Sequence, residues 1–351
     1  MNEQPDQATG DRQPSSALVT GGTGFIAPRL MGALLDRGWQ VRTCGRRPRP
    51  ETLPEDVDYR RADLTGDESL EPLFDGVTHL FHLAGASSSQ STDEQMYRTN
   101  VEGTDNLLGA AYAAGVKRVL HMSTSSIYGK EVDLPQPVPE DVEPHPSPGY
   151  AESKWQGEQV AWGFADKGLA VTVVRPVTVY GPGAIKLLAS SILDAAIERF
   201  AGMEAFAVQA TPVEVRMVHV DDVVAACIHL VEHEAAGGRA YNIAPGFYPT
   251  NHDVGEVIAR ELGLRSQLSD DPDRGMSYED RAQVRERMLA EGMKDNILLK
   301  EKRIRFLKKA NPNNRLSIQA LLDTGFRPQV TDLAGSVAAL IRWYQDERWI
   351  L

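Results

Sequence analysis

The sequence predicts an α/β protein built on a doubly wound parallel sheet, with a smaller mixed α/β unit in its C-terminal part. Three observations predict this fold. Short apolar segments alternate with amphipathic ones up to about residue 175. Such alternation is typical of a parallel sheet that helices cover on both faces. A glycine-rich turn joins the first strand to the first helix, and after residue 180 the alternation loosens.

The elements follow from the apolar periodicity of the chain. In the first half we expect strands at 17–20, 40–44, 59–62, 79–83, 118–122 and 170–175, and helices at 25–37, 69–74, 93–114 and 148–167. In the second half we expect helices at 185–200, 220–234, 252–262, 317–323 and 333–344, with short strands at 206–209, 215–218 and 240–243.

The first strand runs into the stretch LVTGGTGFIAPRL, which carries a G-x-x-G-x-x-A pattern at Gly21, Gly24 and Ala27. The glycines allow a tight turn and a close approach of the backbone to a phosphate, and the third position needs only a small side chain. The unpaired N–H groups of the helix that follows favour an anion. A strand, a tight turn and a helix in this order predict a dinucleotide-binding Rossmann unit. Its phosphate contacts are expected at Gly21, Thr23, Gly24, Phe25 and Ile26.

These observations predict the organisation of the chain. Residues 1–15 are polar and read as a disordered tail rather than a signal peptide. Residues 16–180 form the dinucleotide-binding domain, to which part of the later chain returns, and 181–351 form mainly a substrate-binding domain. Within the latter, 270–312 is a highly charged insert that looks helical, either a lid or a solvated helical face.

Composition narrows the classes of function. The net charge of −12 argues against a nucleic-acid-binding surface, and no apolar run approaches the ~20 residues of a membrane span. Cys44 and Cys227 cannot make a disulfide framework, which favours the cytoplasm. His79, His82 and His121 lack the spacing of metal ligands and read as hydrogen-bonded structural histidines, so we expect no metal site.

The end of the second strand bears on the choice of cofactor. NAD-binding units carry an acidic residue there, which binds the ribose hydroxyls. This chain has Gly45, Arg46 and Arg47 instead, and a guanidinium group binds a 2′-phosphate well. We therefore favour NADP over NAD. Asp63 and Leu64, after the third strand, stand where an adenine edge could be held.

A candidate acid–base pair lies in the helix expected at 148–167. Tyr150 and Lys154 are spaced i, i+4, so they share one helix face. The ordinary pKa of tyrosine, about 10, is too high for proton transfer at pH 7. We expect the Lys154 ammonium and a bound nicotinamide to lower it. Upstream, the turn at 123–126 places hydroxyl groups, among them that of Thr124, at the carboxyl edge of the sheet.

Together these motifs resemble the extended short-chain dehydrogenase/reductase family, also described as NAD-dependent epimerases and dehydratases. The motifs are TGGTGFIA (20–27), HLAG (82–85), NVEGT (100–104), STSSIYG (123–129), YAESK (150–154), RPVTVYGPG (175–183) and HVDD (219–222). The resemblance implies that Thr124 orients the reacting oxygen, Tyr150 transfers the proton and Lys154 holds the nicotinamide ribose. It also implies cofactor contacts at Leu83, Ala84, Gly85, Pro176 and Val179, a supporting network at Asn100, and a homodimer through the helices near 93–114 and 148–167.

The chain departs from subgroups of this family. Ser125 and Ser126 replace the Asp–Glu pair of the dehydratases, and Thr178 replaces an Asn that contacts pyrophosphate in nucleotide-sugar enzymes. Arg216 is offset by one residue from a second such contact, which predicts the opposite face of its strand. The favoured function is an NAD(P)-dependent reductase of a small or medium-sized metabolite. A nucleotide-sugar epimerase with tightly bound NAD is the alternative, and a non-catalytic cofactor-binding scaffold is a third.

Overall fold

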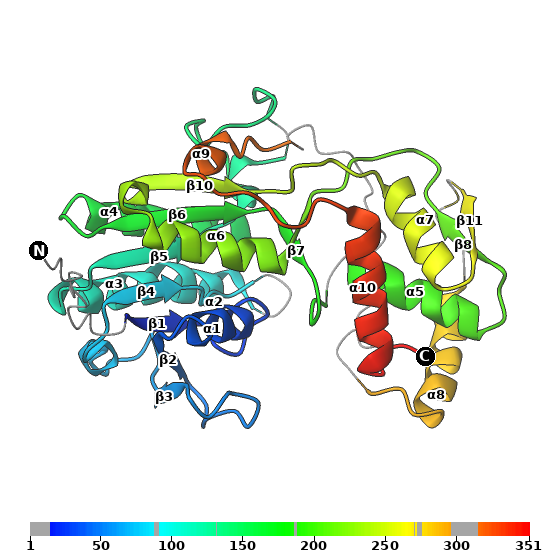
Figure 1. The fold of residues 1–351 in the computed structure, drawn as a ribbon, viewed down its shortest axis with the longest axis horizontal. Coiled ribbons are helices and arrows are strands. Elements are labelled where there is room, and N and C mark those ends of the chain that lie inside the picture. Colours follow the sequence, from blue (N-terminus) through cyan, green and yellow to red (C-terminus); the bar gives the residue numbers. More distant parts are fainter. Residues whose placement is uncertain are drawn as a thin grey trace, which may run out of the picture.

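A seven-stranded parallel sheet forms the centre of the computed structural model, which describes residues 15–87, 91–130, 132–185, 188–269, 271, 276–295 and 315–351. The strand order is β10-β6-β5-β4-β1-β2-β3 (Figure 1). The strands are β1 (Ser16–Thr20), β2 (Gln40–Gly45), β3 (Asp58–Arg61), β4 (His79–His82), β5 (Arg118–Met122), β6 (Val171–Pro176) and β10 (Arg239–Ile243). The order reverses direction beside β1, which is where such sheets bind ligands. The predicted fold class is confirmed.

Helices cover both faces of this sheet, as strands buried on both sides require. One face carries α1 (Ala27–Leu35) and α6 (Val220–Glu232), which share one hydrophobic core with β1. The other carries α3 (Gly103–Ala113) and α4 (Tyr150–Ala165), which form a second core with Leu18 and Leu80. The short helix α9 (Gln319–Asp323) packs beside β10. Short 3₁₀ helices occupy Glu71–Phe74, Ser125–Tyr128 and Glu234–Ala236.

Two sequence expectations about this unit are corrected. The helix expected at 93–114 consists of α2 (Asp93–Tyr97), a π-helical turn at Arg98–Glu102 and α3. The sequence gives no local sign of this turn, which is stabilised by contacts to distant segments. The strand expected at 240–243, which we grouped with the C-terminal elements, pairs in parallel with β6 as an edge strand of the main sheet.

The remaining elements form a smaller cluster at the carboxyl edge of the sheet (Figure 1). Its helices are α5 (Leu188–Phe200), α7 (Asn251–Glu261), α8 (Tyr278–Ala290) and α10 (Leu333–Asp346), and its strands are β8 (Ala205–Val208) and β11 (Arg265–Leu268). These helices and β8 share a third hydrophobic core. The two-stranded pair of β7 (Thr178–Tyr180) and β9 (Met217–His219) links the main sheet to this cluster.

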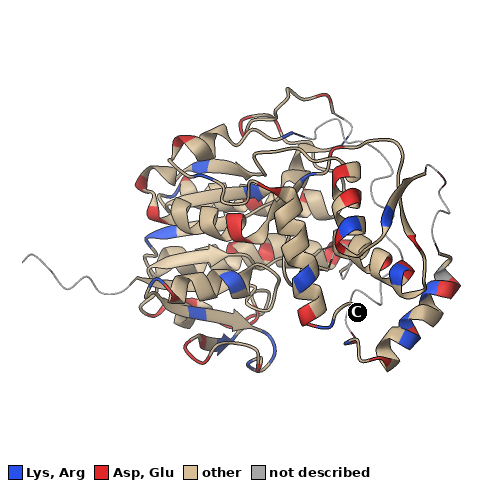
Figure 2. Cartoon of the chain, turned by 45° about the vertical axis from the view of Figure 1, so that its right-hand side comes forward, with Lys and Arg blue, Asp and Glu red and all other residues tan. Residues whose placement is uncertain are grey.

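Part of the charged insert at 270–312 is described. Within it, 278–290 is helical as expected (α8), whereas 270, 272–275 and 296–312 lie outside the described residues. Acidic and basic side chains are interspersed over the helices of both units (Figure 2). In the described part of the chain, no helix combines the length and the apolar character that a membrane crossing needs.

Candidate active site

The carboxyl ends of β1, β4, β5 and β6 face a cavity of about 1130 Å³. Typical single-ligand pockets measure ~300–1,000 Å³, so this cavity suits a cofactor and a second ligand together. Eleven of the site residues expected from the sequence line it: Thr23, Gly24, Phe25, Ile26, Leu83, Gly85, Thr124, Tyr150, Lys154, Pro176 and Val179. The structure thus brings the glycine-rich turn and the Tyr–Lys motif, more than 100 residues apart in the sequence, into one site.

The glycine-rich turn has the geometry that a phosphate site needs. Gly21 adopts a φ of +75°, and a Cβ atom there would lie 3.0 Å from the backbone nitrogen of Ala84. The N–H of Gly24 donates to the carbonyl of Gly21 at 2.8 Å, which closes the turn. Helix α1 begins at Ala27 rather than Phe25, with a proline in its first turn, and no side chain caps it. The first N–H groups of α1 therefore have no side-chain capping partner, and such groups suit an anion.

Tyr150 is the first residue of α4, as the prolines before it predict. The residue before it, Gly149, has a φ of +88°, which sets the entry of the chain into the helix. The phenol is in hydrogen-bonding contact with Thr124, the residue that precedes the 3₁₀ turn at Ser125–Tyr128. Thr124 Oγ1 also accepts from the backbone N–H of Ser126 at 3.2 Å, which orients its hydroxyl. The structure therefore pairs the two hydroxyls of the proposed acid–base set.

The pKa of Tyr150 corrects one expectation. We expected the Lys154 ammonium, together with a bound nicotinamide, to lower it. In the protein alone burial raises the pKa of Tyr150, and only the hydrogen bond with Thr124 opposes this. The Lys154 ammonium instead donates to the carbonyl of Met122 at 2.6 Å. The i, i+4 spacing places the two side chains on one helix face, but the sheet edge determines where the ammonium points.

Lys154 is 5% exposed, and its surroundings control its charge. Burial lowers the pKa of Lys154 to about 8, while the carboxylate of Glu158 opposes the shift. Glu158 is itself completely buried and forms an ion pair with Arg175 of β6, with Nη2 and Oε1 2.5 Å apart. Arg175 also donates to the hydroxyl of Tyr128 at 2.8 Å. A buried, hydrogen-bonded ion pair therefore lies one helical turn beyond the candidate catalytic lysine.

Asn100 belongs to the supporting network that the resemblance implies. It lies in the π-helical turn and is 1% exposed. Its side chain accepts from the N–H of Ala86 at 2.7 Å and donates to the carbonyl of the same residue at 3.1 Å. It also donates to Ser153 Oγ at 2.9 Å. The side chain thus ties the loop after β4, which lines the cavity, to the first turn of α4.

Six expected cofactor contacts are not among the residues that line the cavity. Two of them, Gly21 and Ala84, have backbones that lie against each other at the turn. The other four are Arg46, Arg47, Asp63 and Leu64.

Arg46 and Arg47 are exposed after β2. Burial raises the pKa of Asp63. The hydrogen bonds that it accepts from the N–H and the hydroxyl of Thr65, together with nearby arginine charges, lower the pKa by more, so the net shift is downward. Leu64 packs near the start of α3, against Gly103. The positive charge of Arg46 helps to lower the pKa of Asp63. These two residues, both expected at the adenosine end of the cofactor, therefore lie near each other.

Sequence reasoning missed several lining residues. Lys130 follows the hydroxyl-rich turn, and Arg216 precedes β9; both line the cavity. For Arg216 this corrects the expected opposite face, since pairing of Met217 with Thr178 turns this segment toward the site. The hydroxyl of Ser123 is buried in the lining with no hydrogen-bond partner among the described residues. A single sequence offers no signal for these positions, because their orientation depends on strand pairing.

The histidines near the strands differ from one another. His82 bonds through its two ring nitrogens to Thr20 and Thr104. The ring nitrogens of His121 have no hydrogen-bond partner among the described residues, so the expectation of a hydrogen-bonded histidine is wrong there. Burial lowers the pKa of His82 to about 3, and that of His121 well below its ordinary value. Both rings are therefore neutral at physiological pH. The described residues contain no group of three metal-ligating side chains.

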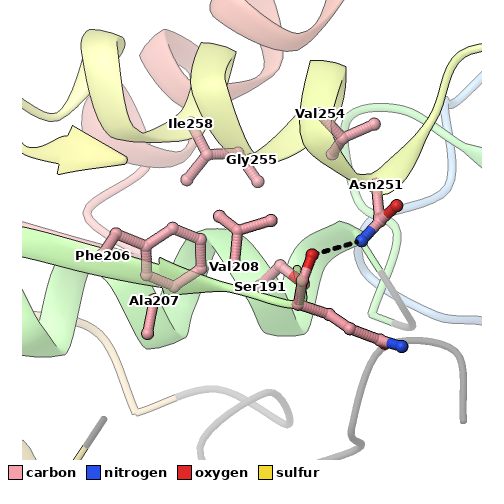
Figure 3. A pocket seen from close by; sticks show the side chains of 9 residues that line it. Ser191, Phe206, Ala207, Val208, Asn251, Val254, Gly255 and Ile258 are labelled. Carbon is pink, nitrogen blue, oxygen red and sulfur yellow. Dashed lines mark hydrogen bonds between the residues drawn. The ribbon is translucent and has the colours of Figure 1, made fainter. Parts of the chain in front are cut away.

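A second cavity lies in the C-terminal cluster, between β8, α5 and α7 (Figure 3). Phe206, Val208 and Ile258 line it with Gly255, and Asn251 donates to the carbonyl of Gln209 at its edge. Its volume is about 40 Å³, which is room for a few water molecules at most. The segment Phe206–Gln209 thus borders a cavity that is too small for a ligand much larger than a few water molecules.

The model of the NAD dependent epimerase/dehydratase family matches residues 17–244, about two thirds of the chain. The chain belongs to this family. Within the family it is similar to the tetraketide α-pyrone reductase 2 of Arabidopsis thaliana, at 31% identity over 249 residues, which cover 64% of this chain and 76% of the relative. It is 36% identical over 178 residues to a putative dihydroflavonol 4-reductase of Synechocystis sp., covering 48% of this chain and 50% of the relative. The chain thus spans about half the length of several curated relatives.

Several solved structures share the fold over nearly the whole chain. MoeE5 in complex with UDP-glucose and NAD is 25% identical, with a TM-score of 0.70, and the match covers 95% of this chain and 99% of that protein. The UDP-glucose 4-epimerase of Thermotoga maritima with UDP-glucose is 22% identical, with a TM-score of 0.71 over 94% of this chain and 99% of that one. At 22% identity, the similarity to the Thermotoga protein shows a shared fold and nothing more.

Proposed function

We propose that this chain is an NAD(P)-dependent oxidoreductase that interconverts an alcohol and a ketone on a small or medium-sized metabolite. The observation that carries the proposal is the contact between Tyr150 and Thr124, in a cavity that also contains Lys154 and the glycine-rich turn. Its relatives include proteins named as reductases, ketoreductases and dehydrogenases.

The residues fit a nicotinamide dinucleotide. Gly21 lets the turn pass close to the backbone of Ala84, where a Cβ atom would be crowded, and the uncapped N–H groups of α1 favour the charge of a phosphate. When bound, the cofactor supplies or accepts the hydride at nicotinamide C4. Lys154, whose ammonium group donates to the Met122 carbonyl at the same edge, would hold the nicotinamide ribose.

The chain's own residues handle the proton. In the reducing direction Thr124 donates a hydrogen bond that orients the substrate carbonyl, and the neutral Tyr150 gives its phenolic proton to the developing alkoxide. The raised pKa of Tyr150 keeps this proton in place at neutral pH until the reaction needs it. In the oxidising direction the phenolate must form first, and in the protein alone only the hydrogen bond with Thr124 favours it.

The Tyr150→Phe variant tests the proton role. We expect NAD(P)H oxidation with a panel of ketones, including ethyl acetoacetate, to fall by roughly 10²–10⁴-fold while the cofactor dissociation constant stays the same. Tyr112→Phe is the matched control, because Tyr112 is 48% exposed on α3, away from the cavity. Retained turnover in the Tyr150→Phe variant would show that another group transfers the proton.

We further propose that NADP is preferred over NAD. The support is the absence of an acid after β2 and the exposed Arg46 and Arg47, although solved relatives are complexes with NAD. Replacing Arg46 by Ser and Gly45 by Asp should move the ratio of dissociation constants toward NAD by about tenfold or more. Gly45→Ala is the control, since any Cβ there would lie 2.9 Å from the Tyr59 hydroxyl. An unchanged ratio would refute the assignment.

A nucleotide-sugar epimerase is the second candidate, favoured by Arg216 in the cavity and by the likeness to MoeE5 with UDP-glucose. Such an enzyme would purify with NAD bound and show no net redox change. A reductase would consume NAD(P)H in proportion to product. A non-catalytic scaffold would bind cofactor and turn over none of the ketones or UDP-sugars.

The proposal includes a homodimer through the faces of α3 and α4, in the cytoplasm. Tyr97 and Tyr112 support such an interface, because both aromatic side chains are about half exposed on this side. The two cysteines are buried free thiols, consistent with a reducing compartment. Sedimentation velocity should give twice the monomer mass, and Tyr112→Glu should shift the equilibrium toward the monomer.

A further inference from the structure

The segment that follows β7 forms part of the wall of the large cavity. Residues 181–185, which we call the wall segment, contribute three residues to the cavity lining. The segment turns tightly, because the N–H of Ala184 donates to the carbonyl of Gly181 at 2.9 Å. It also meets the glycine-rich turn, since a Cβ atom on Gly183 would lie 3.7 Å from the ring of Phe25. The position of the wall segment therefore helps to set the width of the cavity.

Helix α10 donates a hydrogen bond to the wall segment. The hydroxyl of Tyr344 donates to the carbonyl of Ala184 at 2.8 Å. Tyr344 is completely buried, and burial raises the pKa of its phenol, so the hydroxyl keeps its proton at neutral pH and remains a donor. The ring of Tyr344 stacks on that of Trp349, with centroids 5.4 Å apart and 15° between the planes. The donor is therefore carried by a ring that is fixed in place.

A second contact joins α10 to the start of the wall segment. Tyr180 ends β7 directly before this segment, and its hydroxyl lies 2.7 Å from Oγ of Ser336. The hydroxyl of Ser336 donates to the carbonyl of Leu333 at 2.9 Å. Because a serine hydroxyl has one proton to donate, Tyr180 is the donor to Ser336. Ser336 and Tyr344 lie about two helical turns apart on one side of α10, so this helix holds the wall segment near both of its ends.

Helix α10 is a firm support for these two contacts. Its first N–H groups are capped by Asp332, and its buried side chains belong to the third hydrophobic core. In Figure 1 it stands between the main sheet and α7, against which it packs. Ala184 is buried, and a buried carbonyl that loses its donor must shift or remain unpaired at a cost in free energy. A single hydroxyl of α10 therefore bears on where the wall segment lies.

The family model matches residues 17–244 and therefore does not include α10. We propose that Tyr344 and Ser336 are positioning residues, which hold the wall segment and thereby set the size of the substrate group that the cavity accepts. Neither residue is among those that line the cavity, so both act through the wall segment. The inference rests on the proposed function and deepens it, because it names residues that select the ketone or alcohol.

The first experiment measures hydrogen–deuterium exchange of the full chain in the wild type and in Tyr344→Phe, which keeps the ring but removes the donor. We expect the N–H of Ala184 to exchange about tenfold faster, because the turn that protects it opens more often. Peptides of α4 should keep their rates. Tyr248→Phe is the matched control and should leave the Ala184 rate unchanged. The Tyr248 hydroxyl also donates to a backbone carbonyl, that of Leu316 at 3.3 Å, and Tyr248 is not a lining residue.

Ser336→Ala is a second variant, which removes the acceptor of Tyr180 and changes little volume. It should also speed exchange in the wall segment, and it decides the question if the Tyr344→Phe chain does not fold. Ser336→Thr keeps a hydroxyl at this position and should restore the wild-type rate. Rescue by threonine but not by alanine assigns the effect to the hydrogen bond.

The second experiment tests selection by size and needs no turnover. The dissociation constants of ethyl acetoacetate and the bulkier ethyl benzoylacetate are measured by calorimetry in the complex with oxidised NADP, which cannot reduce a ketone. A wall segment that can retreat admits bulk, so the affinity for the larger ester relative to the smaller should rise about fivefold in Tyr344→Phe and Ser336→Ala. Ser336→Thr and Tyr248→Phe should keep the wild-type ratio, and the dissociation constant of NADP should not change.

Three results would overturn the inference. Wild-type exchange rates in both Tyr344→Phe and Ser336→Ala would show that α10 does not hold the wall segment. Faster exchange with an unchanged ratio of ester affinities, or no binding of either ester, would show that the segment does not select the substrate. A loss of NADP affinity as large as the change in that ratio would assign the segment to the cofactor. The proposed function is judged separately, by ketone reduction that depends on Tyr150, so the failures of the two proposals are distinguishable.

Discussion

Two helices of this protein approach their neighbours so closely that a Cβ atom at the contact would require the neighbour to move. In α4, a Cβ atom on Gly157 would lie 2.2 Å from the carbonyl oxygen of Asn100, in the π-helical turn. In α7, a Cβ on Gly255 would lie 2.4 Å from Cγ2 of Val208 in β8. The first neighbour is backbone, whereas the second is a side chain beside the 40 Å³ cavity.

The difference shows where the molecule is rigid. The Asn100 carbonyl belongs to a turn whose side chain is tied to Ala86 and Ser153, so it cannot retreat from α4. Val208 borders empty space and is able to adjust. The helix that carries Tyr150 and Lys154 is therefore fixed by backbone contact, which keeps catalytic groups in a productive geometry. In the C-terminal cluster, side chains that border the second cavity have space to move.

The largest expected effect is on the buried ion pair that anchors the rigid region. Glu158→Gln leaves Arg175 buried without its charged partner, and removing one member of a buried pair costs about 3–5 kcal/mol of unfolding free energy. Urea denaturation measures it. As the control in the C-terminal cluster, Glu204→Gln breaks a pair with Arg265 whose side chains are 84% and 78% exposed, and it should change stability little. Equal losses in the two variants would remove the contrast between the regions.

The same substitution shifts the pH profile. The Glu158 carboxylate raises the pKa of Lys154, which burial has lowered to about 8. Without that carboxylate the ammonium form gives up its proton at a lower pH. If the charged lysine supports catalysis, the alkaline limb of kcat/KM moves to lower pH in Glu158→Gln. If the Glu158→Gln protein is folded and the alkaline limb of its kcat/KM profile does not move, the ionisation of Lys154 is not responsible for that limb.

The next effect concerns the backbone contact. Gly157→Ala forces α4 away from the π-helical turn, and overpacking of this kind costs about 1–3 kcal/mol. Gly163→Ala in the same helix is the control. A Cβ there meets no atom within 4 Å, so the change should instead stabilise by roughly 0.5–1 kcal/mol. We expect kcat to fall in the first variant alone. Similar stabilities for both variants would mean that the contact relaxes freely.

The smallest effect is expected at the second contact. In Gly255→Ala, Val208 can move into the adjoining cavity, and alanine favours the helix, so the net change in unfolding free energy should stay below about 1 kcal/mol. Thermal denaturation of the two glycine variants side by side gives the comparison directly. A loss as large as that of Gly157→Ala would show that β8 is as rigid as the π-helical turn.

Local patterns predicted much of the fold. The first six strands of the main sheet lie within one or two residues of their expected positions. Short apolar segments and the turn residues that bound them are local features, so they can be read from neighbouring residues in the sequence. The same holds for the start of α4 at Tyr150, which the preceding prolines indicate. The π-helical turn and the attachment of β10 to the main sheet were missed, since both depend on contacts between segments far apart in the chain.

The candidate site also has features that the sequence predicts and features that it does not. The residue types at Thr124, Tyr150 and Lys154 and their spacing were readable from the sequence, whereas their electrostatics were not. Burial raises the pKa of Tyr150, and the Met122 carbonyl holds Lys154, and each depends on how the strand ends enclose the side chains.

By itself the sequence determined the strand–turn–helix that suits a phosphate, the helix that carries a phenol and an amine on one face, and the family to which these motifs belong. Only the tertiary structure decided that Lys130 and Arg216 share a cavity with Tyr150, and that backbone contact fixes α4. The reason is physical. Helix periodicity and turn chemistry act over a few neighbouring residues, whereas desolvation and charge in a cavity depend on which distant segments meet there.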